Sequence, residues 1–297
     1  MEPSGTQQVR PCCATGFYPG DAEACHQQLD QLLASVHLPG DLPPERLGGL
    51  VPHAGWVYSG QTAAYLWKAL AESATPPQVV VLLGAVHVRG VHKATVCDAD
   101  SWATPLGPVA LDSALRSELL LCGAGAFDVG SEAHLGEHSL EVQVPFVRRL
   151  LPGASILPVQ VPADDGALEV GRHVADAIRC DGRRVAVVAS SDLTHYGDRY
   201  GFSPVGTGPE ALLFGRDNDR RLVEQALSLS ASGVLSESRS HRNACGPGAL
   251  AAAITAARAL GHTKTRLLHQ TTSHDARPGL SPEPSLFVGY ASLLFGR

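Results

Sequence analysis

The chain has 297 residues, of which 44 % are hydrophobic and 18 % charged, so it can bury a sizeable core in one or two domains. Its formal net charge of −6 argues against nucleic acid or an anionic membrane as the principal partner. No basic segment followed by an apolar one opens the sequence, and no apolar run could span a bilayer, so we expect a cytoplasmic protein. The seven cysteines are odd in number, which is not typical of a disulfide framework.

The first part of the sequence predicts a helix and then a strand–helix–strand unit. Asp21 is the expected N-cap of a helix that ends near Ser35. Residues 47–51 and 79–83 are short apolar runs, and residues 59–71 between them place apolar side chains on one helical face. This order is typical of a βαβ unit, so we expect the two strands to form a parallel pair with a right-handed crossover.

The remaining elements alternate between strands and helices without a break in composition. The expected strands are residues 91–97, 102–111, 155–161, 184–189, 264–272 and 286–295. The expected helices are residues 112–121, 139–151, 165–180, 217–229 and 246–260. Residues 201–215 are rich in Gly and Pro and indicate a loop over the site. We therefore predict one α/β domain over residues 1–297, with a mixed, mostly parallel sheet covered by helices on both faces.

Side chains suited to chemistry follow several of these strands. The motifs are Pro52-His53-Ala54-Gly55, Gly84-Ala85-Val86-His87 and Ser190-Ser191-Asp192-Leu193-Thr194-His195, with Cys245 directly before the helix at 246–260. Open α/β sheets bind ligands at the carboxyl ends of their strands. We therefore expect five side chains to converge on a metal or catalytic centre: His53, His87, Asp192, His195 and Cys245.

Two histidines and one cysteine suit a catalytic transition-metal site with open positions better than a structural site. Imidazole suits iron, zinc and copper, whereas a thiolate favours softer or more covalent binding. The following helix N-terminus lowers the pKa of the Cys245 thiol, which favours a thiolate ligand. The alternative is that Cys245 is a small buried hydrophobic residue among Ala and Gly.

Further polar residues leave two interpretations open. Asp192 and His195 are three residues apart and suit a positioned acid/base pair, or else Asp192 caps a turn and His195 packs in the core. Glu137, His138 and Glu141 form another possible cluster whose role is open, because Glu137 can equally stabilise a helix start by its charge. Four other histidines lie in polar segments and are expected to face solvent: His26, His37, His173 and His262.

At these motifs the chain resembles the MEMO-like family, which includes protein B of the AmmeMemoRadiSam system. The resemblance covers nearly the whole chain and is specific because the motifs occur jointly and in order. The further motifs that carry it are Gly16-Phe17-Tyr18-Pro19, Tyr58-Ser59-Gly60, Glu137-His138-Ser139-Leu140-Glu141-Val142-Gln143-Val144-Pro145-Phe146, His195-Tyr196-Gly197 and Cys245-Gly246. One departure is Gly84-Ala85-Val86-His87, where the family usually has Gly-Pro-Ser/Asn-His.

The resemblance implies a fold like that of class III extradiol (LigB-type) non-haem iron dioxygenases. It places the metal ligands on His53, His87 and Cys245, and the other pocket residues on Asp192 and His195. Fe(II) is then the first expectation for the metal, copper the second and zinc the third. In the dioxygenases the third ligand is a carboxylate, so catechol cleavage does not carry over to a site with a thiolate.

Three functions follow from this resemblance and the ligand set. The first is a metal-dependent redox enzyme of unknown substrate, with His195 as acid/base assisted by Asp192. The second is a non-catalytic protein that binds a metal, a peptide or a partner and keeps a dioxygenase-like pocket. A hydrolase that uses zinc-bound water is the third. The expected partners are a small-molecule or peptide substrate and, from the resemblance, AMMECR1-like and radical SAM proteins.

Overall fold

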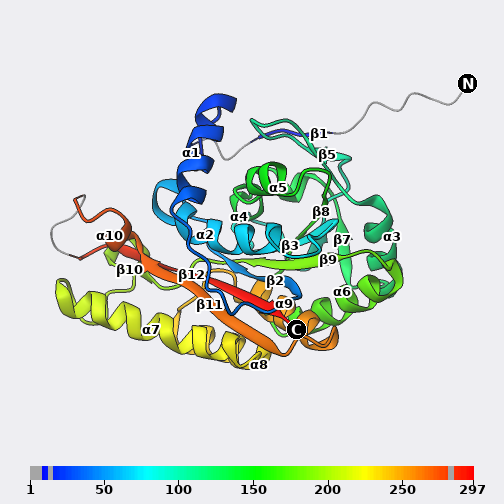
Figure 1. The fold of residues 1–297 in the computed structure, drawn as a ribbon. Coiled ribbons are helices and arrows are strands. Elements are labelled where there is room, and N and C mark those ends of the chain that lie inside the picture. Colours follow the sequence, from blue (N-terminus) through cyan, green and yellow to red (C-terminus); the bar gives the residue numbers. More distant parts are fainter. Residues whose placement is uncertain (1–8, 13–15, 280–283) are drawn as a thin grey trace, which may run out of the picture.

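A mixed β-sheet runs through the protein in a computed structural model that describes residues 9–12, 16–279 and 284–297 (Figure 1). Four neighbouring parallel strands form its centre, in the order β2 (Arg46–Val51), β9 (Val185–Ser190), β3 (Val79–Gly84) and β8 (Ser155–Gln160). On one side the sheet continues with β12 (Phe287–Gly296), which pairs with β2. Strands β10 (His195–Tyr196) and β11 (Lys264–Thr272) also pair with β12, and all three pairings are antiparallel. On the other side it continues with β4 (Ala94–Val96) and β7 (Phe127–Val129).

Helices cover both faces of this sheet, as the sequence predicts (Figure 1). One face carries α1 (Ala22–Ala34), α2 (Trp56–Ala71), α4 (His138–Glu141) and α5 (Val144–Leu150). The other carries α3 (Ser113–Cys122), α6 (Ala167–Asp181), α7 (Pro209–Leu227), α8 (Ala231–His241) and α9 (Pro247–Ala259). Every residue of β3, β9 and β12 is buried, which explains why these strands read as continuous apolar runs. The prediction of a single α/β domain with a mostly parallel sheet is confirmed.

Smaller elements complete the fold. A second sheet contains β1 (Val9–Arg10), β5 (Ser101–Trp102) and β6 (Val109–Ala110). Short helical segments lie at Glu132–His134, Asp198–Tyr200 and α10 (Ser273–Ala276). Asp21 caps α1 as predicted, and Asp112 caps α3; each accepts a hydrogen bond from a backbone N–H three residues later. No helix in the described ranges is long and apolar enough to cross a membrane.

The structure corrects the prediction that the strands at 47–51 and 79–83 pair directly. They are parallel members of one sheet, but β9 lies between β2 and β3 and pairs with both. Helix α2 connects them across this intervening strand. A helix is about 10 Å wide and neighbouring strands are about 4.8 Å apart, so a crossover over one strand packs as well as a direct one.

Other corrections concern the helices. The helix expected at 139–151 is two helices, α4 and α5, with Pro145 in the first turn of α5 where its missing N–H costs nothing. The loop expected at 201–215 ends at Gly208, because Pro209 starts α7. Helix α8 was not predicted, since its sequence is rich in Ser and has a Gly. His262 is 3 % exposed rather than solvated.

Close packing of backbone in β2 depends on two glycines. A Cβ atom at Gly49 would lie 1.8 Å from the carbonyl oxygen of Leu293 in β12, and one at Gly48 would lie 2.0 Å from that of Val187 in β9. Both neighbours are backbone atoms of paired strands, so neither can move without breaking the sheet.

We predict that Gly49→Ala destabilises the protein by about 3 kcal/mol or more, at or above the upper end of ordinary overpacking. Urea unfolding followed by circular dichroism measures this. The matched control is Gly40→Ala, since a Cβ atom there meets nothing within 4 Å, and its effect should stay below about 1 kcal/mol. Equal midpoints for the two variants would contradict the packing argument.

Candidate metal centre

His53 follows β2 and reaches the carboxyl edge of the sheet with 1 % of its surface exposed. Its Nδ1 lies 3.2 Å from Ser190 Oγ, and Nε2 lies 3.1 Å from Cys245 Sγ. The Ser190 hydroxyl donates its proton to the Ser139 carbonyl at 2.6 Å, so its oxygen accepts from His53 Nδ1–H. This fixes the ring so that Nε2 faces Cys245, and its lone pair is available to a metal when the ring is neutral.

His87 follows β3 and is held by a buried carboxylate. Glu137 Oε1 lies 2.9 Å from His87 Nδ1, and Oε2 accepts from the His87 backbone N–H at 2.7 Å. The Glu137 side chain has 0 % exposure and that of His87 has 30 %. Burial raises the pKa of Glu137, but the contacts with His87 outweigh it and lower the pKa to about 2. A carboxylate behind one ring nitrogen leaves the other free to bind a metal, as in many metal sites.

Cys245 lies between these histidines, just before α9. The Asp192 backbone N–H points at its Sγ from 3.3 Å, and Ser191 Oγ lies 3.8 Å away. Burial raises the pKa of the thiol, but His53, His195 and His87 outweigh it and lower the pKa well below the ordinary value of 9.0. The structure therefore favours a thiolate over the interpretation of Cys245 as an inert hydrophobic residue.

Asp192 and His195 both reach this site, but they are not a tight pair. Asp192 Oδ1 accepts from the backbone N–H groups of His53 at 2.6 Å and Ala54 at 3.2 Å. Its Oδ2 is 4.0 Å from His195 Nε2. Asp192 thus holds the turn that carries His53, while His195 keeps one third of its side chain exposed. Burial lowers the pKa of His195, but Cys245 and Asp192 outweigh it and raise the pKa.

His138 is a site residue whose role the sequence left open. Potential ligand atoms of His53, His87 and His138 all lie within 4.8 Å of one another. The His138 ring stacks on His87 at a centroid distance of 4.7 Å, and on Phe17 at 4.4 Å. Burial, with the neighbouring His53 and His87, lowers its pKa to about 4, so it is neutral at pH 7. The sequence pointed to His138 through its cluster with Glu137 and Glu141 and through the family motif that contains it.

Glu141 belongs to a different cluster. Its carboxylate binds Arg10 Nη1 at 2.6 Å and Tyr18 Oη at 2.7 Å, and both Arg10 and Glu141 are buried. Arg10 also lies over the Trp102 ring at 4.2 Å and binds the carbonyl of His134. Glu137 and Glu141, one helical turn apart, therefore serve separate purposes, since Glu137 contacts His87 and Glu141 binds Arg10 and Tyr18.

Comparison with known proteins decides the family. A model of the Memo-like protein family matches residues 10–294. The chain belongs to the Memo-like family. A MEMO1 family protein of Methanopyrus kandleri is 36 % identical to this Memo-like protein over 97 % of its chain and 98 % of the relative. One of Thermococcus kodakarensis is 34 % identical over 97 % and 99 %.

A solved structure supports the fold alone. An uncharacterized protein of Escherichia coli K12 matches the Memo-like protein with a TM-score of 0.52 at 17 % identity. The match covers 84 % of this chain and 99 % of that one.

The turn before His87 departs from the usual family sequence. Ala85 and Val86 stand where the family usually has Pro and Ser or Asn, and His87 still lies in the site.

We predict that Glu137→Gln lowers the pKa of His87 by at least about 1 unit, because an opposite charge at this distance raises a histidine pKa by that order. Burial alone would lower the His87 pKa, but Cys245 and Glu137 raise it to about 10 from 6.5. Stability from the raised His87 pKa is present below pH 6.5 and lost as the pH rises through about 10, and that from the lowered Glu137 pKa is present above pH 4.5 and lost as the pH falls through about 2, so the variant should lose most stability between pH 4.5 and 6.5. NMR titration and urea unfolding of chelator-treated protein measure both effects.

The control for this prediction is Glu72→Gln, which removes a carboxylate that is 55 % exposed and 4.0 Å from Lys68. It should leave the His87 titration unchanged. A His87 resonance that titrates at the same pH with and without the Glu137 carboxylate would contradict the assigned pairing.

Proposed function

We propose that this Memo-like protein is a metal-dependent redox enzyme, with Fe(II) as the first choice of metal, copper the second and zinc the third. The observation that best supports this proposal is the contact of His53 Nε2 with Cys245 Sγ at 3.1 Å, beside His87. Two imidazoles and a thiolate form a mixed nitrogen and sulfur donor set, which suits these metals and not magnesium or calcium.

The surroundings of the donor atoms fit a metal. Both histidines have their Nδ1 atoms engaged, by Ser190 and Glu137, so each would present Nε2. His53, His87 and Cys245 would hold the ion, and His138 is an alternative to Cys245 as third ligand because of its distance to the other two histidines. When bound, iron or copper supplies one-electron redox chemistry.

The remaining residues would position the site and move protons. His195 has a raised pKa and one third of its side chain exposed, which suits proton exchange between the site and solvent. Asp192 would act through His53, since its carboxylate fixes the His53 turn. His138, neutral at pH 7, adds no charge beside the ligands.

We predict that His53→Ala and Cys245→Ala each lower the affinity for Fe(II) by about tenfold or more, and that the double variant loses stoichiometric metal. Protein purified without oxygen and loaded with Fe(II), Cu(I) or Zn(II) is analysed for metal content by mass spectrometry. His26→Ala and Cys180→Ala are matched controls, because both residues are exposed. Full stoichiometry in the double variant would refute the ligand assignment.

Alkylation of thiols distinguishes Cys245 from His138 as the third ligand. A bound metal should protect Cys245 selectively, and its peptide mass reports the protection. The position of Cys180 in or beside apolar elements of the sequence predicts slow reaction, but the structure exposes it, so it should react in both forms. Equal labelling of Cys245 with and without metal would exclude it as a ligand and leave the three histidines.

Oxygen consumption distinguishes the proposed redox enzyme from the alternative, a non-catalytic binding protein. The Fe(II)-loaded protein should consume O₂ faster than the Cys245→Ala variant when supplied with catechols or a cell extract. His195→Ala should lower the rate without lowering the metal content, because His195 is proposed to move protons and not to bind metal. Uptake equal to that of the Cys245→Ala variant would favour the binding protein.

A further inference from the structure

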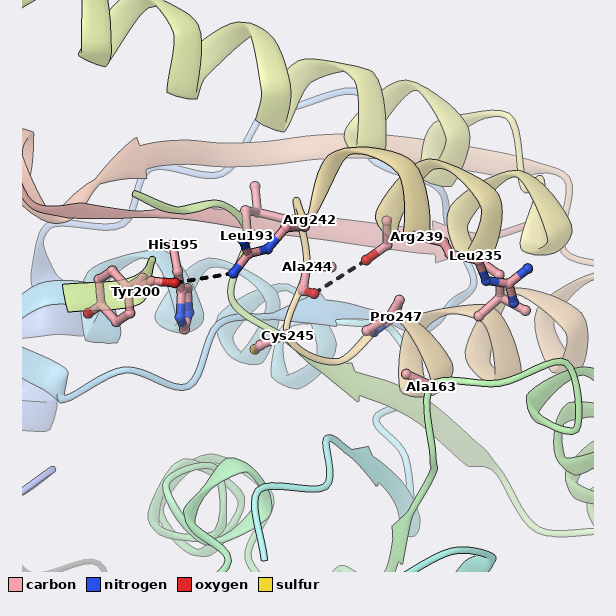
Figure 2. A pocket seen from close by; sticks show the side chains of 11 residues that line it. Ala163, Leu193, His195, Tyr200, Leu235, Arg239, Arg242, Ala244, Cys245 and Pro247 are labelled. Atoms are coloured by element: carbon pink, nitrogen blue, oxygen red, sulfur yellow. Dashed lines mark hydrogen bonds between the residues drawn. The ribbon is translucent and has the colours of Figure 1, made fainter. Parts of the chain in front are cut away.

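A cavity of about 410 Å³ opens beside Cys245 and His195. It lies between the loop after β9, the end of α8 and the start of α9, and Figure 2 shows Cys245 on its wall. Its size falls in the usual range for small-molecule sites. The cavity therefore gives a ligand access to the candidate metal centre from the side of His195.

The charge of this cavity is opposite to that of the whole chain. Its described lining includes Arg239 and Arg242 but no Asp or Glu, whereas the protein carries a net charge of −6. Arg239 has an exposed partner in Asp165 at 3.2 Å. The Cys245 thiol is the acidic group of this lining, but His53, His195 and His87 contact it, so the two guanidinium groups favour small anions.

The backbone conformation of Arg242 and the hydrogen bonds of its guanidinium hold it beside the cavity. It ends α8 with a φ of 53°, a left-handed conformation that costs a non-glycine residue about 1 kcal/mol or more. Its Nη1 and Nη2 donate to the carbonyls of Gly201 and Tyr200 at 2.9 and 3.1 Å, and its guanidinium lies over the Phe202 ring. Since a guanidinium has five N–H groups, these bonds position it and leave further donors for a ligand.

Besides the polar residues His195, Tyr200, Ser238 and Cys245, the lining has an apolar part. Leu193 and Leu235 are almost fully buried, and Ala163, Ala244 and Pro247 line the same space. Figure 2 shows Arg242 near His195 and Tyr200, with Pro247 and Leu235 farther along the cavity. A ligand with one anionic group and a short apolar body would match this arrangement of a fixed cation and an apolar wall.

We propose that the cavity binds a small organic anion, a carboxylate or phosphoryl compound with an apolar body, whose anionic group is held by Arg242. Arg239 adds to the positive potential from the other part of the lining. The role of this anion as the substrate of the metal centre rests on the proposed function, whereas its binding does not. Arg242 would thus determine substrate specificity.

The test is titration of the full-length, chelator-treated protein by calorimetry with benzoate, phenylphosphonate and the uncharged benzamide. At least one anion should bind about tenfold or more tightly than benzamide, because a charge-assisted hydrogen bond of Arg is lost with the neutral probe. The two anions separate carboxylate from phosphoryl recognition. Equal affinities for all three probes would overturn the proposal.

Variants assign the effect to Arg242. Arg242→Gln should remove the preference for anions, and Arg242→Lys, which keeps the charge but not the forked donors, should retain part of it. Arg239→Gln should weaken binding less than Arg242→Gln. The matched control for Arg239→Gln is Arg220→Gln, because both side chains are 63 % exposed and ion-paired, and only Arg239 lines the cavity.

Circular dichroism and unfolding midpoints establish that each variant is folded. If Arg242→Gln does not fold, the proposal is tested by the preference for anions over benzamide, measured in the wild type and in Arg239→Gln. An unchanged preference in a folded Arg242→Gln variant would overturn the proposal. Metal content, measured separately, shows independently whether the proposed metal centre fails.

Discussion

The candidate site depends on one buried residue, Asp192. Its carboxylate accepts from the backbone of the His53 turn, its N–H points at the Cys245 sulfur, and its carbonyl accepts from the Cys245 N–H at 3.3 Å. A buried carboxylate is costly unless its oxygens are satisfied. By meeting that requirement with the backbone of the His53 turn, Asp192 joins the end of β2 to the loop before α9, although 139 residues separate it from His53.

Helix α7 supports the same loops from behind. Asp219 accepts from the Thr194 backbone N–H at 2.9 Å, and Asn218 donates to the Thr194 hydroxyl and to the carbonyl of His241. Asn243 in turn donates to the Asn218 carbonyl. Two adjacent side chains of α7 thus brace both the segment that carries His195 and the one that carries Cys245, and precise placement of ligands requires such support.

Local signals in the sequence account for much of this arrangement. The caps at Asp21 and Asp112 and the apolar runs of β3 and β9 are encoded within a few residues, so these elements could be predicted. The convergence of His53 and Cys245 followed from their positions at strand and helix ends. The insertion of β9 between β2 and β3 could not be predicted, because strand order is set by contacts between residues more than 100 positions apart.

Polar residues were harder to assign than apolar ones, because their function depends on which partner the fold supplies. His138 is the first residue of the single-turn helix α4, and its ring contacts those of His53 and His87, which lie far from it in the sequence. Glu141 looked like a companion of Glu137, yet Arg10 from the N-terminal strand binds it.

The charges of the site give it a further property. Asp192 and Glu137 are buried acids and Cys245 is a partly exposed one, and the imidazoles of His53 and His87 have raised pKa values in their presence. These shifts favour the protonated rings beside the Cys245 thiolate and the Glu137 carboxylate. A divalent cation held by the same two rings would replace two such protons and leave the net charge of the site unchanged. Neither the metal-free, protonated site nor the metal-bound site would then contain an uncompensated charge. The same hydrogen bonds to Ser190, Glu137 and Asp192 can therefore serve both forms.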